Sequence, residues 1–250
     1  MNEFKDKVAF ITGGTNGMGY ATAQQFIAAG GKVIITGRSA ATVNDAIERL
    51  GNNAVGIVSN AGNMEDVFQL RQKVRQYTDV IDLLFANAGY GKFASIEDVD
   101  ETHFDELFNM LVKGVFFTVQ QVLPLMGPGS AVVLNTSFVT ETGMPNFSVY
   151  SAAKAAVGSF IKTMAAALTD KQIRVNGISP GHIKTNIFNN TGLAAVQVQQ
   201  AIARIIPTIP FKRQGEPAEV ANAVLFLASP AASYIHGVEL KVDAGISVIR

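Results

Sequence analysis

The sequence predicts an α/β fold in which helices cover both faces of a doubly wound parallel sheet of about seven strands. Short apolar runs rich in β-branched residues recur along the chain, and their nearly continuous apolar character is typical of parallel strands buried on both faces. Helical patterns stand between these runs, as right-handed crossovers between parallel strands require. The chain has 250 residues, 48% of them hydrophobic. This length and composition favour a single domain, residues 1–250, with a complete core.

The apolar runs define the expected strands, which are, in chain order, VAFIT (8–12), KVIIT (32–36), AVGIV (54–58), IDLLFAN (81–87), AVVLN (131–135), IRVNGIS (173–179) and VELKV (238–242). In the first crossover Ala23, Phe26 and Ile27 repeat at helix spacing, and Gly30-Gly31 predicts the helix end. One segment, at about 186–210, is irregular and lies between a Pro-Gly turn and the next helix. Its length and position predict a small lid over a site.

Composition excludes several classes of function. Basic and acidic residues balance at 20 each, so no global charge recruits nucleic acid or an anionic membrane. Cysteine is absent, which excludes disulfides and thiolate chemistry, and three scattered histidines leave little for a metal site. The charged MNEFKDK segment runs directly into a strand and no apolar run reaches membrane-spanning length. We therefore expect a cytoplasmic protein with no metal, nucleic-acid or membrane partner.

A glycine-rich turn, TGGTNGMG (12–19), follows the first expected strand and precedes the first helix. Glycines allow positive φ and a close approach of backbone N–H groups to a pyrophosphate, which then lies at the helix N-terminus. The spacing differs from the common G-x-G-x-x-G fingerprint, and a tight turn without a ligand also gathers glycines. Its position after the first strand favours nucleotide binding. The residues expected at the cofactor are Gly13, Thr15, Asn16, Gly17, Met18 and Gly19.

The end of the second strand selects between the two nicotinamide cofactors, because a carboxylate there accepts from a ribose 2′-OH and repels a 2′-phosphate. Here the chain has Arg38 and Ser39 and no carboxylate. The arginine fork can hold a phosphate and the serine adds a donor, which favours NADP(H). Asn16 is neutral, so no second basic residue stands in the glycine turn. Some use of NAD(H) is therefore also expected.

Tyr150 and Lys154 lie one helical turn apart. Side chains four residues apart share a helix face, so the lysine ammonium can lie beside the phenol and favour its ionised form. A tyrosine tuned in this way can act as an acid and base near neutral pH, although the same spacing is common on ordinary helix surfaces.

Together these motifs resemble the short-chain dehydrogenase/reductase family, over essentially the whole chain. The matching motifs, in order, are TGGTNGMG (12–19), Ala86-Asn87-Ala88-Gly89, Ser137 followed thirteen residues later by the Tyr150-x-x-x-Lys154 pair, Ser179-Pro180-Gly181 with Ile183 and Thr185, Arg213-Gln-Gly-Glu-Pro217, and Val242-Asp243-Ala-Gly245. The resemblance implies a Rossmann-type fold and hydride transfer between nicotinamide and a carbonyl.

The resemblance also implies residue roles. Tyr150 would give the proton, Ser137 would hold the same oxygen, and Lys154 would bind the nicotinamide ribose and lower the pKa of Tyr150. The further cofactor contacts that it implies are Asn60 and Ala61 at the adenine, Asn87, Ala88 and Gly89 at the adenine-side ribose, Pro180, Gly181 and Ile183 in the nicotinamide-side loop, and Thr185 at the carboxamide.

One position departs from the family pattern. Relatives carry Asn-x-x-Gly in a helix, where the asparagine helps to hold a water that relays protons to the lysine. In this chain Gly114 matches the glycine, and Leu111 stands at the asparagine position. Leucine cannot form hydrogen bonds, so the relay must be rerouted or weakened. The departure indicates natural divergence or engineering.

The expected substrate pocket is largely apolar, which favours a hydrophobic ketone over a sugar phosphate, although some of its side chains could be plain core. The pocket residues are Phe138, Met144, Phe147, Phe188, Leu193 and Ile206. A 3-oxoacyl-carrier-protein reductase is the enzymatic alternative, but LPLMGPGSAVV (123–133) lacks the basic residues that dock an acidic carrier. A non-catalytic NADP-binding sensor or scaffold is the alternative from another class. Apolar helices near 104–123 and 152–168 resemble the pair through which this family commonly forms dimers and tetramers, so the resemblance implies a homodimer or homotetramer, although burial against the sheet would explain part of their apolar character.

Overall fold

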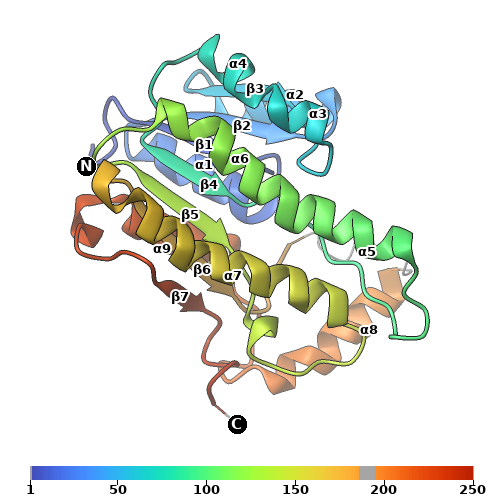
Figure 1. Cartoon of the computed structure of the whole chain (residues 1–250). Helices are drawn as coiled ribbons and strands as arrows, with labels where there is room; N and C mark the ends of the chain where they lie inside the picture. Colours follow the sequence, from blue (N-terminus) through green and yellow to red (C-terminus); the bar gives the residue numbers. More distant parts are fainter. Residues whose placement is uncertain (1, 186–194, 250) are drawn as a thin grey trace.

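The computed structural model describes residues 2–185 and 195–249. Its centre is a seven-stranded sheet in the order β3-β2-β1-β4-β5-β6-β7, and all paired neighbours run parallel (Figure 1). The strands are β1 (Val8–Ile11), β2 (Lys32–Gly37), β3 (Ala54–Val58), β4 (Leu83–Ala86), β5 (Ala131–Asn135), β6 (Arg174–Pro180) and β7 (Glu239–Val242). The predicted doubly wound, Rossmann-type single domain is confirmed.

Helices connect successive strands. The α-helices are α1 (Gly17–Ala28), α2 (Ala40–Leu50), α3 (Met64–Phe68), α4 (Leu70–Arg75), α5 (Glu101–Phe108), α6 (Gly114–Val122), α7 (Ser148–Leu168), α8 (Ala195–Ile205) and α9 (Pro217–Ala228). A π-helical turn, η1 (Asn109–Lys113), joins α5 to α6. Short 3-10 turns are η2 (Leu123–Leu125), η3 (Phe138–Thr140), η4 (Thr169–Lys171), η6 (Ile206–Thr208) and η7 (Pro230–Ala232).

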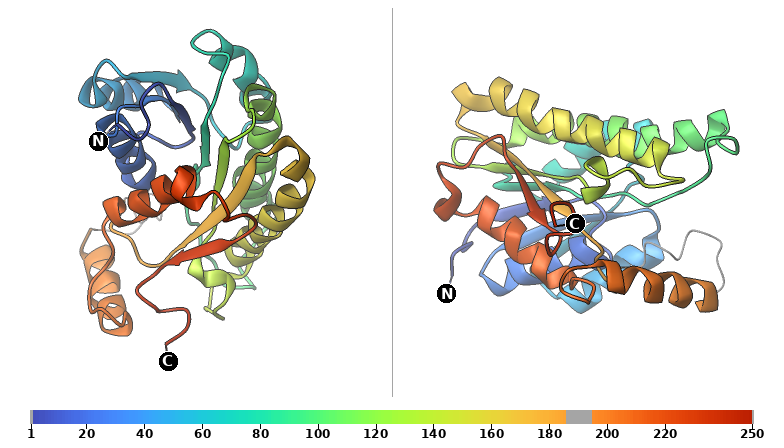
Figure 2. Two further views of the ribbon diagram at one scale, coloured as in Figure 1. Left: turned by 90° about the vertical axis from the view of Figure 1, so that its left-hand side faces the viewer. Right: turned by 90° about the horizontal axis from the view of Figure 1, so that it is seen from below.

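Two apolar cores lie on opposite faces of the sheet because strand side chains alternate. In β1, Phe10 packs with α3, α4, α6 and α7, whereas Ala9 and Ile11 pack with α1, α2 and α9. Figure 2 shows these two helix layers on either side of the sheet. Both faces are therefore covered, as the continuous apolar runs predict.

The observed elements differ from the sequence boundaries mainly where a strand ends in a site. The fourth strand is shorter than the predicted 81–87, because Asn87 turns its side chain toward the glycine-rich turn. In the predicted lid, residues 195–205 form α8, and residues 186–194 lie outside the described residues. Within the described chain, no helix combines the length and apolar character needed to cross a membrane.

The strand order reverses between β1 and β4. The chain moves from β1 outward to β3, and then returns to place β4 on the other side of β1. Crossovers that leave in opposite directions open a crevice at the carboxyl ends of the two strands. The glycine-rich turn after β1 and the Asn87-Ala88-Gly89 segment after β4 meet there.

Candidate active site

A cavity of about 1050 Å³ extends along the carboxyl edge of the sheet. Its walls come from the ends of β1, β2, β3, β4, β5 and β6 and from the first turns of α7. It contains all three predicted catalytic residues and most of the predicted cofactor residues. The predicted residues that line it are Gly13, Thr15, Asn16, Gly17, Met18, Arg38, Ser39, Ala61, Asn87, Ala88, Gly89, Ser137, Phe138, Met144, Phe147, Tyr150, Lys154, Pro180, Gly181, Ile183 and Thr185.

The glycine-rich turn leaves backbone donors free at the start of α1. Gly13 and Gly17 have φ values of +65° and +55°, which side chains strongly disfavour. Asn16, the N-cap, makes no side-chain hydrogen bond to the helix. The first N–H groups of an α-helix lack internal partners, and the helix dipole favours an anion beside them. The turn therefore offers a pyrophosphate site facing the cavity.

Hydrogen bonds join this turn to the end of β4. The Thr12 hydroxyl accepts from the backbone N–H groups of Asn87 and Ala88, both at 3.0 Å. The Asn87 amide donates to the carbonyl oxygens of Thr12 and Gly13 at 3.1 and 3.2 Å. Gly19 lies behind this junction, outside the lining of the cavity. A Cβ there would lie 2.4 Å from Gly13 O, so this position needs glycine to pack against the turn. The structure thus gives Gly19 a packing role and does not place it at the predicted cofactor contact.

The end of β2 presents Arg38 at the cavity. Its guanidinium carbon lies 5.9 Å from the ring centre of Tyr90, which lines the same cavity. Among the described residues no carboxylate pairs with Arg38, so its donors are available to a ligand. Ser39 caps α2 by accepting from the Thr42 N–H at 3.3 Å.

Asn60 does not line the cavity, although its neighbours Ser59 and Ala61 do. Its side-chain oxygen accepts from the Gly62 N–H at 3.1 Å, and its own N–H donates to Asp66 at 2.9 Å. The amide oxygen expected to meet the adenine is therefore used within the turn after β3. The backbone on either side of it remains exposed to the cavity.

Ser137, Tyr150 and Lys154 meet where β5 ends and α7 begins. Ser137 follows β5 after Thr136, and Tyr150 lies in the first turn of α7 with Lys154 one turn later. All three are buried in the cavity wall, with exposed fractions of 8%, 8% and 4%. Lys154 Nζ donates to the Asn135 carbonyl oxygen at 2.7 Å and lies 6.0 Å from the Tyr150 ring centre. The helix thus holds the phenol and the ammonium on one face, as their spacing predicts.

The direction of the Tyr150 pKa differs from the expectation. Burial raises the pKa of Tyr150 to about 12, and the nearby Ser137 hydroxyl offsets only part of this rise. Burial also lowers the pKa of Lys154 to about 8, although the negative charge of Glu239 partly offsets this by raising it. Lys154 was expected to lower the pKa of Tyr150. Burial outweighs this effect because it disfavours both the phenolate of Tyr150 and the ammonium of Lys154, and Lys154 donates to Asn135 instead of the phenol. Tyr150 is consequently a protonated donor at neutral pH.

The cavity fits a nicotinamide dinucleotide. The helix N-terminus and Arg38 suit phosphates. The buried side-chain oxygen of Asn135, a residue of the lining, has no hydrogen-bond partner among the described residues. Across the cavity, a Cβ at Gly17 would meet the Thr185 side chain at 3.3 Å, so the turn closely faces the loop after β6. Such a cofactor, when bound, supplies the hydride. Ser137, Tyr150 and Lys154 present hydroxyl and ammonium donors in the same cavity.

The wall beside Tyr150 is aromatic. Phe93 and Phe147 stack with ring centres 4.0 Å apart, and Phe93 meets Tyr150 edge to face at 5.5 Å. Sequence reasoning missed Phe93 and Tyr90, although both follow directly after the Asn87-Ala88-Gly89 motif. Of the remaining predicted pocket residues, Ile206 is half-buried but its neighbour Ile205 lines the cavity. Phe188 and Leu193 lie outside the described residues.

Leu111 lies in the π-helical turn η1 and is fully buried. It packs in the same apolar cluster as Tyr150 and Ala153, and a Cβ at Gly89 would lie 2.7 Å from its Cδ2. An apolar side chain thus fills the space beside the catalytic helix at the position where the family carries an amide.

Replacing Leu111 by asparagine is expected to change both the turnover rate and its pH profile, and to cost about 1–3 kcal/mol of stability because the amide is buried. Steady-state rates across pH and urea unfolding measure the two effects. Leu107→Asn is the control, since Leu107 is equally buried in the same cluster one turn earlier. It should lose stability without the change in pH profile; unchanged rate and pH profile in Leu111→Asn would remove the functional significance of position 111.

Comparisons with known proteins agree with this geometry. A family model described as enoyl-(acyl carrier protein) reductase matches residues 13–247. A 3α-hydroxysteroid dehydrogenase of Mediterraneibacter gnavus is 35% identical over 246 residues, which cover 96% of each chain. The structure is similar to a 3-ketoacyl-(acyl-carrier-protein) reductase of Brucella melitensis complexed with NADH, with TM-score 0.88, 28% identity and coverage of 98% of this chain and 99% of the other. It also resembles a short chain dehydrogenase of Burkholderia cenocepacia in complex with NADP, with TM-score 0.87, 27% identity and coverage of 99% and 100%.

Proposed function

We propose that this chain, which belongs to the short-chain dehydrogenase/reductase family, is an NADP(H)-dependent oxidoreductase that acts on a hydrophobic ketone or secondary alcohol. The observation that carries the proposal is the meeting of Ser137, Tyr150 and Lys154 in the same cavity as the glycine-rich turn. A nucleotide site without a proton donor would not need this trio, and a proton donor without a nucleotide site would lack a hydride source.

Each of the three residues has a distinct task in the proposed reduction. Tyr150 donates its proton to the carbonyl oxygen as the carbon gains hydride, which leaves a neutral alcohol. Ser137 donates a hydrogen bond to the same oxygen and stabilises the charge that develops on it. Lys154 carries positive charge beside the phenol and offers donors to the ribose of the cofactor. In alcohol oxidation the same groups act in reverse.

The apolar, aromatic wall favours a hydrophobic substrate. Phe93, Phe147 and Phe138 leave few polar side chains to bind a sugar hydroxyl or a phosphate near Tyr150. The relative from Mediterraneibacter gnavus is named for a 3α-hydroxysteroid, which is a secondary alcohol on an apolar ring system. We therefore place ketones with bulky apolar groups first among the substrates to test. NADPH oxidation with a panel of aryl and alicyclic ketones tests the proposal directly.

Arg38 is proposed to determine the preference for NADPH. Replacement by glutamine removes charge-assisted hydrogen bonds to a 2′-phosphate, so kcat/KM for NADPH should fall roughly 10- to 100-fold while that for NADH changes little. Steady-state kinetics with both cofactors measures this. Arg75→Gln is the control, because Arg75, the last residue of α4, is also exposed and pairs with Asp79 outside the lining of the cavity. An equal loss with NADPH and NADH would contradict the proposed role.

Reduction of a 3-oxoacyl group on a carrier protein is the alternative, favoured by the description of the family model and by the Brucella neighbour. Docking of an acidic carrier needs available basic residues near the entrance. Several basic residues adjacent to cavity-lining positions are paired, namely Lys92 with Glu106, Lys184 with Glu216 and Arg213 with Glu219. Among the described residues this leaves Arg38 and Arg204 without a carboxylate partner. Faster reduction of an acyl-carrier substrate than of free ketones would favour this alternative.

A non-catalytic NADP-binding sensor or scaffold is the alternative from another class. Its discriminating result is tight NADPH binding without oxidation by any ketone of the panel. The complete catalytic trio argues against it, because a sensor has no use for a buried proton donor beside the nicotinamide side of the cavity.

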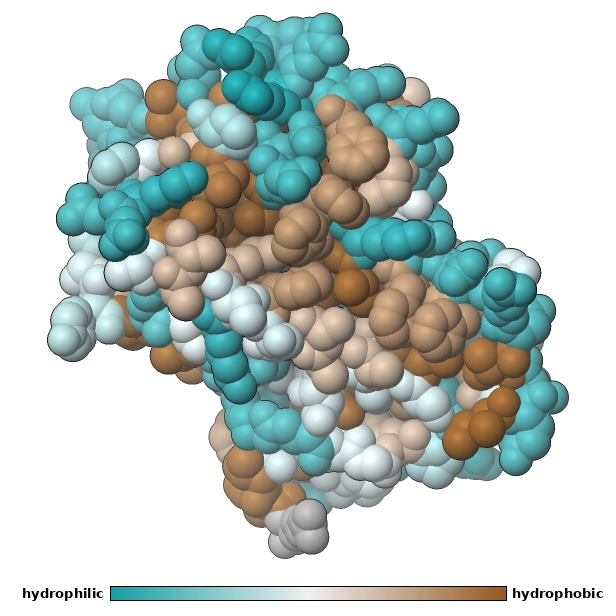
Figure 3. Space-filling model, in the orientation of Figure 1, coloured by the Kyte–Doolittle hydropathy of each residue, from teal (hydrophilic) through white to brown (hydrophobic). Residues whose placement is uncertain are grey.

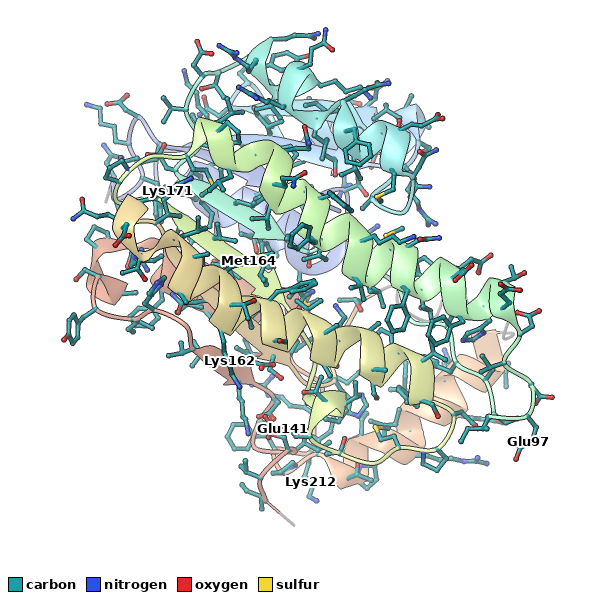
Figure 4. All side chains as sticks on the ribbon, in the orientation of Figure 1. Glu97, Glu141, Lys162, Met164, Lys171 and Lys212 are labelled. Atoms are coloured by element: carbon teal, nitrogen blue, oxygen red, sulfur yellow. The ribbon has the colours of Figure 1, made fainter. Side chains whose placement is uncertain are left out.

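We also propose that the chain assembles as a homodimer or homotetramer through the face formed by α6 and α7. Figure 3 shows an apolar band across this face, and Figure 4 labels Met164 of α7 within it. Phe116 is 37% exposed and packs with Phe117 and Phe160 across the two helices. Analytical ultracentrifugation tests this assembly, and a monomer at micromolar concentration would contradict it.

A further inference from the structure

Lys154 carries a charge that its immediate hydrogen-bond partner does not neutralise. The ammonium is 4% exposed, and the acceptor found for it among the described residues is the neutral carbonyl oxygen of Asn135. A buried ammonium has three donors and loses its hydration, so it is costly to keep charged unless an anion lies near it. The burial of Lys154 therefore calls for a carboxylate in the surrounding wall.

Glu239, the first residue of β7, supplies that carboxylate. Its Oε1 and the carbonyl oxygen of Ile178 share the hydroxyl proton of Thr136, which is buried and directly follows Asn135. Its Oε2 lies against α7 at Gly158, one turn after Lys154, where a Cβ would stand 3.4 Å from it. Because Gly158 has no side chain, nothing at that position separates the carboxylate from the helix. Both oxygens are thus fixed on the side of α7 that carries Lys154.

The other charged groups on the elements packed against α7 have hydrogen-bond or ion-pair partners of their own, or are exposed. Lys241 of β7 pairs with Glu141 at 2.5 Å, and Figure 4 labels Glu141 in the segment after η3. The Asp243 carboxylate accepts from the N–H groups of Gly245 and Ser247. On the helices packed against α7, Lys113 of η1 and the acidic residues of α5 point to solvent, and Tyr150 is the titratable neighbour on α7 itself. Glu239 is accordingly the carboxylate whose charge raises the pKa of Lys154 against burial.

We propose that Glu239 is a positioning residue for the reaction: its carboxylate, anchored by Thr136, keeps the Lys154 ammonium charged and oriented within the cavity wall. For turnover this inference rests on the proposed function, since it concerns the lysine that serves Tyr150. It assigns the compensating charge to β7, a strand at the edge of the sheet. The charge of Lys154 then depends on β7 and not on helix η1.

The direct test follows the titration of Lys154 by NMR in cofactor-free protein labelled at the lysine side-chain carbon, with the Lys154 signal identified by its loss in Lys154→Met. Burial, opposed by the charge of Glu239, lowers the pKa of Lys154 to about 8. In Glu239→Gln, which keeps the size of the side chain, the midpoint should fall by roughly half a unit or more, as expected when one nearby charge is removed from a partly solvated site. Glu239→Asp, which keeps the charge, should retain a midpoint closer to wild type.

Glu141→Gln is the control, because it removes a carboxylate that pairs with Lys241 of the same strand, whereas Glu239 is the carboxylate that raises the pKa of Lys154. An unchanged Lys154 midpoint in Glu239→Gln, or an equal shift in Glu141→Gln, would overturn the inference. In the active enzyme, the alkaline limb of kcat for ketone reduction should move to lower pH in Glu239→Gln alone. If the wild type reduces no ketone, the proposed function fails, whereas the NMR comparison still decides the role of Glu239.

Discussion

Tyr150→Phe is expected to lose ketone reduction by roughly 10²- to 10⁴-fold while the fold and NADPH binding persist. The substitution removes one hydroxyl and keeps the ring, which packs edge to face on Phe93 and Phe147. Burial raises the pKa of Tyr150 to about 12, so the wild-type phenol is protonated at neutral pH, as the proposed role of proton donor requires. Without the Tyr150 hydroxyl, the developing alkoxide keeps only the Ser137 hydrogen bond and has to take its proton from water.

The measurement pairs NADPH oxidation with fluorescence titration of NADPH binding. Tyr77→Phe serves as the control, because Tyr77 is 53% exposed and follows α4 at the surface. It should retain full activity. Activity of Tyr150→Phe within a few-fold of wild type would place the proton donor elsewhere and remove the basis of the proposed mechanism.

The fold was predictable because its signals are local and repeated. Parallel strands buried on both faces need apolar runs such as AVVLN. Each run is followed by a helical pattern, and the crossover connection between parallel strands is right-handed. The order of strands then places the ends of β1 and β4 side by side, which brings Gly13 and Asn87 together although they are distant in the sequence. Strand ends were less predictable where a side chain leaves the strand to form a site, as at Asn87.

The site was predictable where one residue type is required at a fixed position in a motif. Such positions are Tyr150, Lys154 and Arg38, because the charge, acidity and length of the side chain decide what each residue can do. Phe93 was missed because its orientation toward Tyr150 depends on tertiary contacts. Its ring lies over Gly91, where a Cβ would stand 2.4 Å from it.

Electrostatic tuning was the least predictable property. The four-residue spacing places Lys154 near Tyr150, but spacing contains no information about how much water remains around the pair. Burial proves to be the larger effect and raises the pKa of the phenol. Glu239 belongs to a strand 85 positions later in the chain than Lys154, so no local motif could indicate its approach to α7.

Gly114→Ala is expected to destabilise the protein by about 2–4 kcal/mol, although alanine is the better helix former. Gly114 begins α6 with helical φ, so its backbone is not strained. A Cβ at this position would lie 2.1 Å from the carbonyl oxygen of Ala61, which is backbone and cannot rotate away. The helix and the turn after β3 would have to separate. Because Ala61 lines the cavity, NADPH affinity should weaken together with stability.

Urea unfolding and NADPH titration of the same variant measure both effects. Gly143→Ala is the matched control, since a Cβ at Gly143 would meet no atom of residues 2–185 and 195–249 within 4 Å and its φ is not positive. That variant should stay within about 0.5 kcal/mol of wild type, as is usual for a surface substitution. Equal stability of the two variants would show that α6 can move away from Ala61 without cost. A loss of stability in Gly114→Ala with unchanged NADPH affinity would instead separate the helix contact from the cofactor site, and would assign Gly114 to packing alone.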